Sequence, residues 1–444
     1  MKSMSPSRLK QGHLLYPDLL EQLNPKHPLL ALAQKLPWEQ FEKDFAQFYS
    51  SVGRPAKPIR LMVGLLLLKQ IENLSDERVV AAWIQNPYFQ AFCGIEHFQW
   101  IQPCDPTELV YFRRRIGKAG IEKIFQASIA LHGEKSSERE VVIDTTVQEK
   151  NITFPTDTKL RVKVMNRLWK IAKEEGIQLR RSYRLELRKT LRVIRFNRNE
   201  RDKKKVAAAK RRIKTMTNVL LRDVMRKLPA GSLMARKEEF EKYQRAVNQE
   251  RKDKNKIYSL HEPEVVCICK GKEHKKYEFG SKAAVAMTKT HGILVGAKEF
   301  RNEYDGDTLE GLLTQIETVR GKAPEIAYCD RGFRGRKKVG NTTIVMPGSP
   351  GPDVSEYEKR KARKNFGRRS AIEPVIGHMK SDFRLARNYL KGTIGDAINL
   401  LLAAAAFNFK KWLNALAERL IFVLIFLGNL GACRSVNTDK KSSA

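Results

Sequence analysis

The sequence has few acidic residues for its length. Only 49 Asp and Glu stand against 84 Lys and Arg in 444 residues, which gives a formal net charge of +35 at pH 7. So large an excess of positive charge needs a counter-charge, and nucleic acid is the usual source. A basic protein of the membrane surface is the alternative. The length allows two or three domains, each with its own core.

Cysteine is also scarce, and its spacing excludes the common cysteine frameworks. The six cysteines form no Cys-x-x-Cys pair, so neither a zinc knuckle nor a redox dithiol is indicated. We therefore expect free thiols in a reducing cytoplasm. One weak exception is the stretch from His261 to His274. Cys267 and Cys269 share one face of a predicted strand there and could bind zinc, although a plain strand is the favoured interpretation.

Long apolar runs and a secretion signal are lacking too. The most apolar stretch is LIFVLIFLGNL, residues 420–430, whereas a membrane span needs about 20 residues. The first residues, MKSMSPSRLKQGHLLYPDLL, contain no long apolar core and no small-residue cleavage site. We predict a cytoplasmic protein without a membrane partner. Residues 416–444 should form a buried apolar helix and a disordered tail.

Residues 1–135 have the apolar spacing of helices, for example in IRLMVGLLLLKQIENLSDERVVAAW. Ser75 is predicted to cap one helix and Thr107 another. A run of arginines then follows on the second of these helices: Arg113, Arg114 and Arg115. The region is predicted to be a helical DNA-binding domain. A solvated helix face is the alternative for the arginines.

Strand patterns begin after this region and return near residue 265. REVVIDTTVQ predicts a buried strand that ends at Asp144, and KNITFPTDTKL predicts a second strand and turn. Further strands are predicted at EVVCICKG, KYEFGSKAAVAMT, GILVGAKEF, EIAYCD and NTTIVMP. A helix with Asp307 as its cap separates GILVGAKEF from EIAYCD, which ends at Asp330. Asp157, Asp305 and Asp307 are interpreted as turn and cap residues.

The segment 159–256 differs from both flanks because it is strongly basic. It contains 33 Lys and Arg and 11 Asp and Glu, a net charge of +22. Leu, Ile, Val and Met recur at helical spacing, which predicts two or more long basic helices. Like charges at this density repel one another unless an anion screens them. A surface for DNA phosphates is therefore favoured over a solvated coiled coil.

Three carboxylates are the candidate catalytic residues. Asp144 and Asp330 end predicted strands, and Glu373 lies in a helix after the last strand. Strand ends and a helix face can converge at one edge of a sheet. Carboxylates are ligands that Mg²⁺ (or Mn²⁺) prefers, and three of them can hold two ions for phosphodiester chemistry.

The spacing around Glu373 also resembles a known signature. Bacterial insertion-sequence transposases of the DDE type, in the insertion-sequence-four/five superfamily, carry Tyr, two residues, Arg, three residues, Glu, six residues and Lys. Phe366, Arg369, Glu373 and Lys380 stand at these spacings, with Phe366 in place of the tyrosine. VVIDTT and YCDRGFRG are similar to the motifs of the first two acids. The N-terminal helices and the stretch HEPEVVCICKGKEHKKYEFGSK resemble the insertion-sequence-five branch.

The resemblance implies an RNase H-like α/β catalytic core over 136–415, with a mixed sheet flanked by helices and interrupted by the basic insertion. It implies a metal site at Asp144, Asp330 and Glu373, with Arg369 and Lys380 on the substrate phosphates. The expected activity is cleavage of insertion-sequence ends and strand transfer into target DNA. The expected partners are terminal inverted repeats, target DNA and a second copy of the chain, in the bacterial nucleoid.

Other functions remain open from the sequence. The chain could be a DNA-binding remnant that has lost catalysis, a metal-dependent nuclease without strand transfer, or an RNA-associated basic protein. If Glu373 lay on one continuous helix, Phe366, Arg369 and Lys380 would share its face. Pro374 opposes this arrangement, because proline disfavours helix at the preceding residue. The helix could instead begin at that proline.

Overall fold

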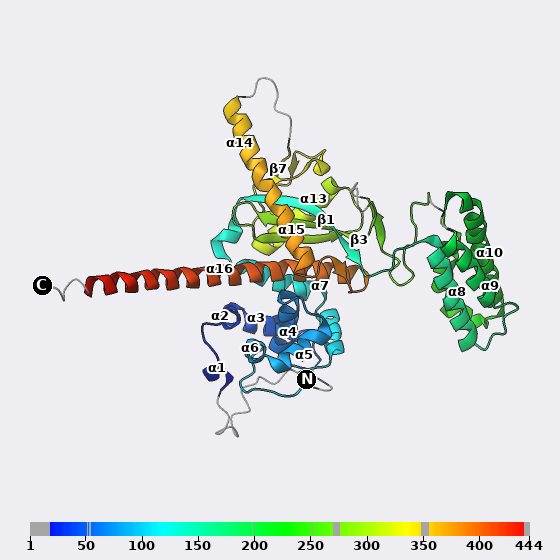
Figure 1. Ribbon diagram of the computed structural model, residues 1–444, viewed down its shortest axis with the longest axis horizontal. Coiled ribbons are helices and arrows are strands. Elements are labelled where there is room, and N and C mark those ends of the chain that lie inside the picture. The colour runs from blue at the N-terminus through cyan, green and yellow to red at the C-terminus, as the bar shows by residue number, and fades with distance from the viewer. Residues whose placement is uncertain are drawn as a thin grey trace. The chain divides into compact units, whose positions relative to one another are not determined.

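The structure is a computed structural model that describes residues 18–50, 52, 55–197, 199–250, 252–269, 276–347 and 355–438. It divides into two compact units, which are described separately below (Figure 1). Unit 1 comprises residues 1–148, 282–390 and 394–444, and unit 2 comprises residues 149–281 and 391–393.

The N-terminal part of unit 1 is helical, as predicted. Its helices are α1 (Leu19–Gln22), α2 (Pro28–Lys35), α3 (Trp38–Ala46), α4 (Ile59–Ile71), α5 (Asp76–Gln85), α6 (Pro87–Phe92) and α7 (Pro106–Ala130), followed by the 3₁₀ turn η2 (Gly133–Ser137). Nearly all of α4 is buried, as expected for a helix that is apolar on every side. Ser75 caps α5, which confirms that prediction. Asp105 caps α7 in a capping box with Glu108, so the prediction of Thr107 was wrong.

The strands form one mixed sheet. Its strands are β1 (Glu140–Lys150), β2 (Val266–Ile268), β3 (Glu278–Thr288), β4 (Leu294–Phe300), β5 (Ile326–Tyr328), β6 (Lys338–Val339), β7 (Thr342–Val345) and β8 (Arg387–Asn388). The order is β2-β3-β1-β5-β7-β6, with β4 on β3 and β8 on β1. β5 is parallel to β1 and to β7, whereas β3 is antiparallel to β2 and β4.

The strand predictions were correct except near β1. This strand continues through Asp144 to Lys150, and no second strand follows it among the described residues up to α8. Both faces of β1 are buried over most of its length, although its only apolar residues are Val141, Val142, Ile143 and Val147. Asp144 therefore lies inside β1 rather than at its end. β5 behaves differently, because its pairing with β1 stops at Tyr328 and Asp330 follows the end of the strand.

Helices complete unit 1. They are α13 (Asp305–Arg320), the 3₁₀ turn η4 (Arg331–Phe333), α14 (Glu356–Gly367), the 3₁₀ turn η5 (Arg368–Ala371), α15 (Ile372–Ser381) and α16 (Gly392–Thr438). The N-terminal helices, the sheet and α16 share one apolar core. Asn408 on α16 joins the core to β4, because its side chain accepts from Leu294 N–H at 3.0 Å and donates to the Leu294 carbonyl at 2.8 Å.

The helix α16 is longer than the sequence suggested. It begins well before the predicted apolar helix over 416–444 and continues through Thr438, so part of the predicted disordered tail is helical; residues 439–444 lie outside the described residues. Its segment Gly392–Ala417 is long and apolar enough to cross a membrane, but 78% of this apolar stretch is buried inside the protein. This is the behaviour of a core helix.

Unit 2 contains the basic insertion and has a core of its own. Its helices are α8 (Asp157–Glu174), α9 (Arg184–Phe196), the 3₁₀ turn η3 (Glu200–Asp202), α10 (Lys203–Lys227), α11 (Ala230–Ala235) and α12 (Lys237–Asn248). Figure 1 shows α8, α9 and α10 packed side by side. Apolar side chains such as Leu168 on α8, Leu220 on α10 and Phe240 on α12 form the core. The predicted basic helices are therefore confirmed.

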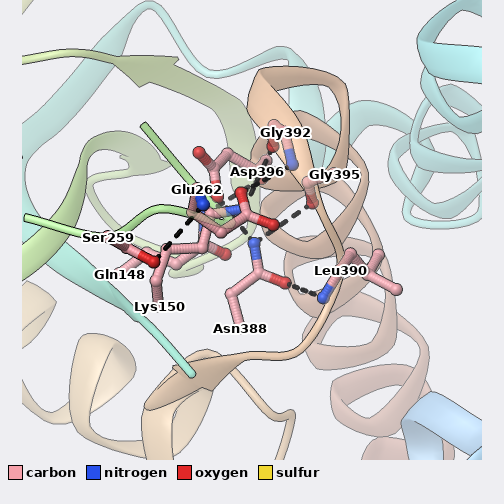
Figure 2. A network of polar contacts seen from close by, with 9 residues as sticks. All are labelled: Gln148, Lys150, Ser259, Glu262, Asn388, Leu390, Gly392, Gly395 and Asp396. Atoms are coloured by element: carbon pink, nitrogen blue, oxygen red, sulfur yellow. Dashed lines mark hydrogen bonds and ion pairs between the residues drawn. The ribbon is translucent and has the colours of Figure 1, made fainter. Parts of the chain in front are cut away.

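Polar side chains secure the chain segments near residues 390–396 (Figure 2). In unit 2, Lys150 donates to the Gly392 carbonyl at 3.0 Å and pairs with Glu262 at 3.5 Å, and Glu262 accepts from Gly392 N–H at 2.9 Å. In unit 1, Asn388 donates to Asp396 at 2.7 Å, and Gln148 donates to the Asp396 carbonyl at 3.1 Å. These groups are buried with their partners, so the network is structural.

Candidate active site

The register of the sheet brings the first two candidate acids together. β1 and β5 are parallel neighbours, and Val142 lies opposite Tyr328 in the last pair. Asp144 and Asp330 each lie two residues beyond this last pair, and both are partly buried. Both carboxylates act electrostatically on the thiol of Cys329, so they lie near the same residue.

The backbone after β5 fixes the Asp330 side chain. Asp330 is extended and caps the turn η4, where its Oδ1 accepts a hydrogen bond from Gly332 N–H at 2.8 Å. The preceding Cys329 is fully buried. Burial raises the pKa of the Cys329 thiol, the negative charges of Asp330 and Asp144 raise it further, and Arg369 opposes them. Asp144, Asp330 and Arg369 thus act electrostatically on one buried thiol.

Glu373, the third candidate acid, lies on a helix. It lies in the first turn of α15, with its carboxylate 3.9 Å from the Arg369 guanidinium and its side chain 64% exposed. Pro374 is the third residue of α15, where a missing N–H breaks no helical hydrogen bond. The chain changes from α14 through the 3₁₀ turn η5 to α15. Phe366 on α14 and Arg369 in η5 therefore do not share one continuous helix with Glu373, whereas Lys380 lies on α15 with it.

The three predicted metal ligands are not gathered around a single point. Among the described residues, no three His, Cys, Asp or Glu side chains stand close enough to hold a metal ion together. Asp144, Asp330 and Arg369 act on the same Cys329 thiol, and Glu373 pairs with that Arg369.

A fourth carboxylate, Asp305, lies at the same edge of the sheet. It begins α13, and its Oδ1 accepts from Thr145 Oγ1 at 3.1 Å and pairs with Lys282 Nζ at 2.8 Å. A Cβ atom added to Gly332 would stand 2.9 Å from Asp330 Oδ1 and 3.0 Å from Asp305 Oδ2. The two carboxylates therefore border one small space that only a glycine leaves open.

The sequence interpretation of Asp305 as a turn or cap residue missed this position. α13 begins at Asp305 rather than at Asp307, and Asp307 caps nothing; it pairs with Arg336 at 3.2 Å instead. The sequence did contain a signal, because Asp305 follows a predicted strand and precedes a helix. Asp330 likewise follows a strand and precedes a helical turn. Its partners Thr145 and Lys282 are far away in the sequence and could not be inferred from local pattern.

Comparisons with known proteins assign the chain to a family. Residues 17–115 match the family described as Transposase domain (DUF772), and residues 247–409 match the Transposase DDE domain. A relative from Rhizobium meliloti, named "Uncharacterized protein ORF8 in nfe locus", is 43% identical over 201 residues, which is 44% of this chain and 97% of the relative. The chain belongs to the DDE transposases. No solved structure matches it.

The DDE family match covers two of the three predicted acids of this transposase. Asp330 and Glu373 lie within residues 247–409, whereas Asp144 and the basic helices of unit 2 up to Ala246 lie outside the matched ranges. DDE domains support DNA transposition, so DNA is the substrate class of the chain. The resemblance to insertion-sequence transposases is thereby confirmed at the level of the family.

One predicted DNA contact of the transposase is wrong. Arg113 is 3% exposed and binds Asp76 through two hydrogen bonds of 2.7 Å, and Lys69 pairs with the same carboxylate at 2.9 Å. Successive helical positions differ by about 100°, so three consecutive arginines cannot all face solvent. The side chain of Arg113 points into the protein, where it stabilises the fold. Arg114 and Arg115 are exposed.

Burial and nearby charges shift the pKa values of Lys69 and Asp76, the two residues that lie with Arg113. Burial, followed by the nearby charge of Arg113, lowers the pKa of Lys69 to about 8, although Asp76 opposes the change. Burial alone would raise the pKa of Asp76. The hydrogen bond from Arg113 and the charges of Lys69 and Arg113 outweigh burial and lower the pKa of Asp76 to about 2. The aspartate is therefore held in its charged form.

Three further residue groups have structural contacts or placements that bear on a possible role. Phe366 is partly buried and packs edge-on against Tyr328, with 6.2 Å between ring centroids, so its ring supports the core, and its contact with DNA stays a prediction. His378 pairs with Asp382 at 2.8 Å, one turn along α15. The weak zinc prediction has no support among the described residues, and His274 lies outside them. Cys267 is on β2 and Cys269 directly follows it.

Proposed function

We propose that this transposase binds insertion-sequence ends, cleaves them in a metal-dependent reaction and transfers the freed strand to target DNA. The observation that supports this most directly is the register of β1 and β5, whose last pair, Val142 and Tyr328, lies two residues before Asp144 and Asp330. Glu373 completes the set in sequence, and its carboxylate lies 3.9 Å from the Arg369 guanidinium.

The strand order supports an RNase H-like core. In chain order, β1 is followed, after the insertion, by the antiparallel pair β3 and β4, then by α13, the parallel strand β5 and β7. The predicted fold requires this succession: three antiparallel strands, a helix, a parallel strand, a further strand and a closing helix. α14 and α15 occupy the closing position, and α15 carries Glu373.

The residues at this edge fit divalent cations. Their donors are carboxylate oxygens, which suit Mg²⁺ or Mn²⁺, and the space beside Gly332 is bordered by two of them. Asp144, Asp330 and Glu373 would hold the ions, whose chemistry when bound is to activate the attacking oxygen and stabilise the leaving oxygen of a phosphodiester. Arg369 and Lys380 would hold the phosphates beside Glu373 and fix the scissile bond in place.

The N-terminal helices provide a second surface for DNA. Arg115 stacks over the Tyr49 ring at 4.6 Å, and both line an open pocket of about 560 Å³ together with the exposed Tyr111. Guanidinium groups bind phosphates, and stacked Arg and Tyr side chains also suit nucleobases. We assign end binding to this surface, with Arg114 and Arg115 as its contacts.

The helices of unit 2 provide the third surface. On α9, the exposed Arg184, Arg188, Arg192 and Arg195 recur every three or four residues and therefore line one face. Glu186 is the one acidic residue of α9, and it is paired with Arg212 at 2.6 Å. A row of arginines along one helix is complementary to a phosphate backbone. We propose that the insertion binds DNA without reading its sequence.

The proposed reaction also implies an assembly and a site of action for the protein. Two element ends must be cut and joined in one event, so we propose a dimer or higher assembly on paired terminal repeats. The site of action is the bacterial nucleoid in the cytoplasm.

The test is a cleavage and joining assay with labelled DNA that carries the flanking ends of the element. We expect wild-type protein to cut and join in Mg²⁺ and to do neither in EDTA. Asp330→Ala should abolish both steps while DNA binding is retained. Binding without chemistry in either protein would replace the proposal with a DNA-binding remnant, and cutting without joining would replace it with a nuclease.

A further inference from the structure

We propose that Gln70 and Asn73 are positioning residues for DNA cleavage, because they hold the end of α15, the helix that carries Glu373. This inference rests on the proposed function, in which Glu373 takes part in the reaction. Gln70 and Asn73 lie in the N-terminal transposase domain over residues 17–115, whereas α15 lies in the DDE domain over residues 247–409. The contact therefore joins the helices to which we assign end binding with a helix of the proposed active site.

Three hydrogen bonds make this contact, and they link residues 308 to 313 positions apart in the sequence. Gln70 Nε2, near the end of α4, donates to the Phe383 carbonyl at 2.6 Å, and Gln70 is only 2% exposed. Asn73 Nδ2 donates to the Ser381 carbonyl at 3.0 Å. In the opposite direction, the Arg384 guanidinium donates to the Asn73 carbonyl at 3.1 Å. The two segments are therefore tied together in both directions.

The bond to Ser381 completes the hydrogen bonding at the C-terminal end of α15. The last four carbonyls of a helix have no partner within the helix. Those of His378, Met379 and Lys380 accept from backbone N–H groups that follow α15, at 2.8–3.3 Å. The fourth, on Ser381, accepts from the Asn73 side chain instead. The N-terminal helices thus supply one of the four groups that finish this helix.

The backbone on both sides of the contact is in the left-handed region. Asn73 has a φ of 53° and Arg384 a φ of 64°, and among the described residues Tyr183 is the one further non-glycine residue with a positive φ. Glycine is the usual residue in this conformation after a helix, and asparagine is the common substitute. At position 73 the asparagine also provides the donor to Ser381. Arginine rarely adopts this conformation, and such strained residues persist where the surrounding structure holds them, often at functional sites.

The held end of α15 determines where its other end lies. Glu373 is in the first turn of this ten-residue helix and Ser381 is its last residue. At 1.5 Å per residue the two are about 12 Å apart along one continuous helix. A shift at Ser381 therefore displaces the Glu373 carboxylate and Lys380 as well. A misplacement of about 1 Å is enough to lower the rate of a reaction about a hundredfold.

The N-terminal side of the contact leads to the proposed end-binding surface. Lys69, next to Gln70 on α4, pairs with Asp76 at 2.9 Å, and Arg113 binds the same carboxylate at 2.7 Å. On α7, Arg113 is followed directly by the two exposed arginines to which we assign contacts with the element end. A DNA end bound there is held at a fixed place relative to α15, which is the condition for cutting it at one phosphodiester.

Two substitutions remove the donors with little other change. Gln70→Met keeps the length of a buried side chain, and Asn73→Gly keeps the turn, because glycine adopts a positive φ without strain. Gln90→Met is the matched control. Gln90 is a fully buried glutamine of the N-terminal helices, and its side chain donates to the Trp83 carbonyl at 3.2 Å and to the Gln99 carbonyl at 2.8 Å. Both of these partners lie within the N-terminal helical region.

The experiment uses the full-length protein and measures the two steps separately. Filter binding gives the affinity for labelled end DNA, and single-turnover cleavage in Mg²⁺ at saturating protein gives the rate of the reaction. We expect Gln70→Met to lower this rate about tenfold or more, with an affinity within about twofold of wild type. Asn73→Gly should act in the same direction. Gln90→Met should lower the melting temperature and leave the cleavage rate of the folded protein unchanged.

A second measurement does not depend on activity. Amide hydrogen exchange without DNA, followed by mass spectrometry, reports how firmly α15 and the turn after it are held. Exchange over residues 372–385 should become faster in Gln70→Met and Asn73→Gly and stay unchanged in Gln90→Met. If Gln70→Met does not fold, Asn73→Gly decides the question, because Asn73 is exposed.

The outcomes separate this inference from the proposed function. If wild type cleaves the ends and both variants cleave at its rate, the proposed function stands and the positioning role is wrong. A fall in rate and affinity together, equal to that of Gln90→Met, would mean that Gln70 only stabilises the fold. If wild type cleaves no end DNA, the proposed function is wrong and the positioning role fails with it.

Discussion

Two groups of charged residues in unit 1 are built in opposite ways. Asp76 is enclosed by Lys69 and Arg113, and its contacts with them measure 2.7–2.9 Å. Around Glu373, the carboxylate is 64% exposed and stands 3.9 Å from Arg369. Both groups pair acids with bases, yet only the first satisfies its charges within the protein.

The difference shows which charges serve the fold and which serve a ligand. A buried ion pair has lost its water, so each member depends on the other, and removal of one leaves the other uncompensated. An exposed, long ion pair contributes little to stability. Its charges remain available for phosphates or cations. The following substitutions are chosen to break or sharpen this contrast.

The largest stability effect should come from Asp76→Asn. Lys69 and Arg113 would keep their charges in a buried setting without a counter-charge, which costs about 3 kcal/mol of unfolding free energy. Urea denaturation measures this loss. Asp44→Asn is the control, since its partner Lys123 is 43% exposed, and it should cost less than about 1 kcal/mol. Equal losses in the two variants would remove the contrast.

The pH dependence of stability should isolate the same carboxylate. The pKa of Asp76 falls from 3.8 to about 2 on folding, so its contribution is complete above about pH 4 and is lost as pH falls through about 2. The shift corresponds to about 2 kcal/mol. Denaturation at several pH values in this window should show a steeper loss for wild type than for Asp76→Asn. Parallel curves would contradict the assigned pKa.

The smallest stability effect should come from Arg369→Gln, at less than about 0.5 kcal/mol. Its effect should appear instead in DNA affinity, because a lost phosphate contact lowers the slope of log affinity against log salt by about 1. Filter binding at several salt concentrations measures that slope. The control Arg139→Gln removes an exposed arginine at the other end of β1 and should leave the slope unchanged.

The sequence predicts the elements of this protein better than their contacts. The strand with Asp144, the strand before Asp330 and the cap at Ser75 could be predicted, because residues close together in the sequence determine each of them. Arg113 could not be placed, because its partner Asp76 is 37 positions away and the direction of one arginine among three depends on packing. The spacing around Glu373 was informative, but the 3₁₀ turn η5 breaks the continuous face that helical spacing implies.

The site shows the same division. Asp144 and Asp330 were candidates because acids near the ends of neighbouring parallel strands can converge, and β1 and β5 are such neighbours, although Asp144 lies inside β1. The contacts of Asp305 with Thr145 and Lys282, and its approach to a Cβ on Gly332, could not be predicted, because these residues are far from it in the sequence. A glycine that makes room for other residues is indistinguishable in sequence from one that makes a turn.

The boundaries of unit 2 fall inside two strands rather than in loops. The chain enters unit 2 between Gln148 and Glu149 on β1 and returns between Ser281 and Lys282 on β3, and these strands are neighbours in the sheet. Adjacent strands can be joined by a short hairpin. The 133 residues between these two points can therefore differ in length and sequence without a change in the register of β1 with β5, so the same position suits the insertion of a different helical module.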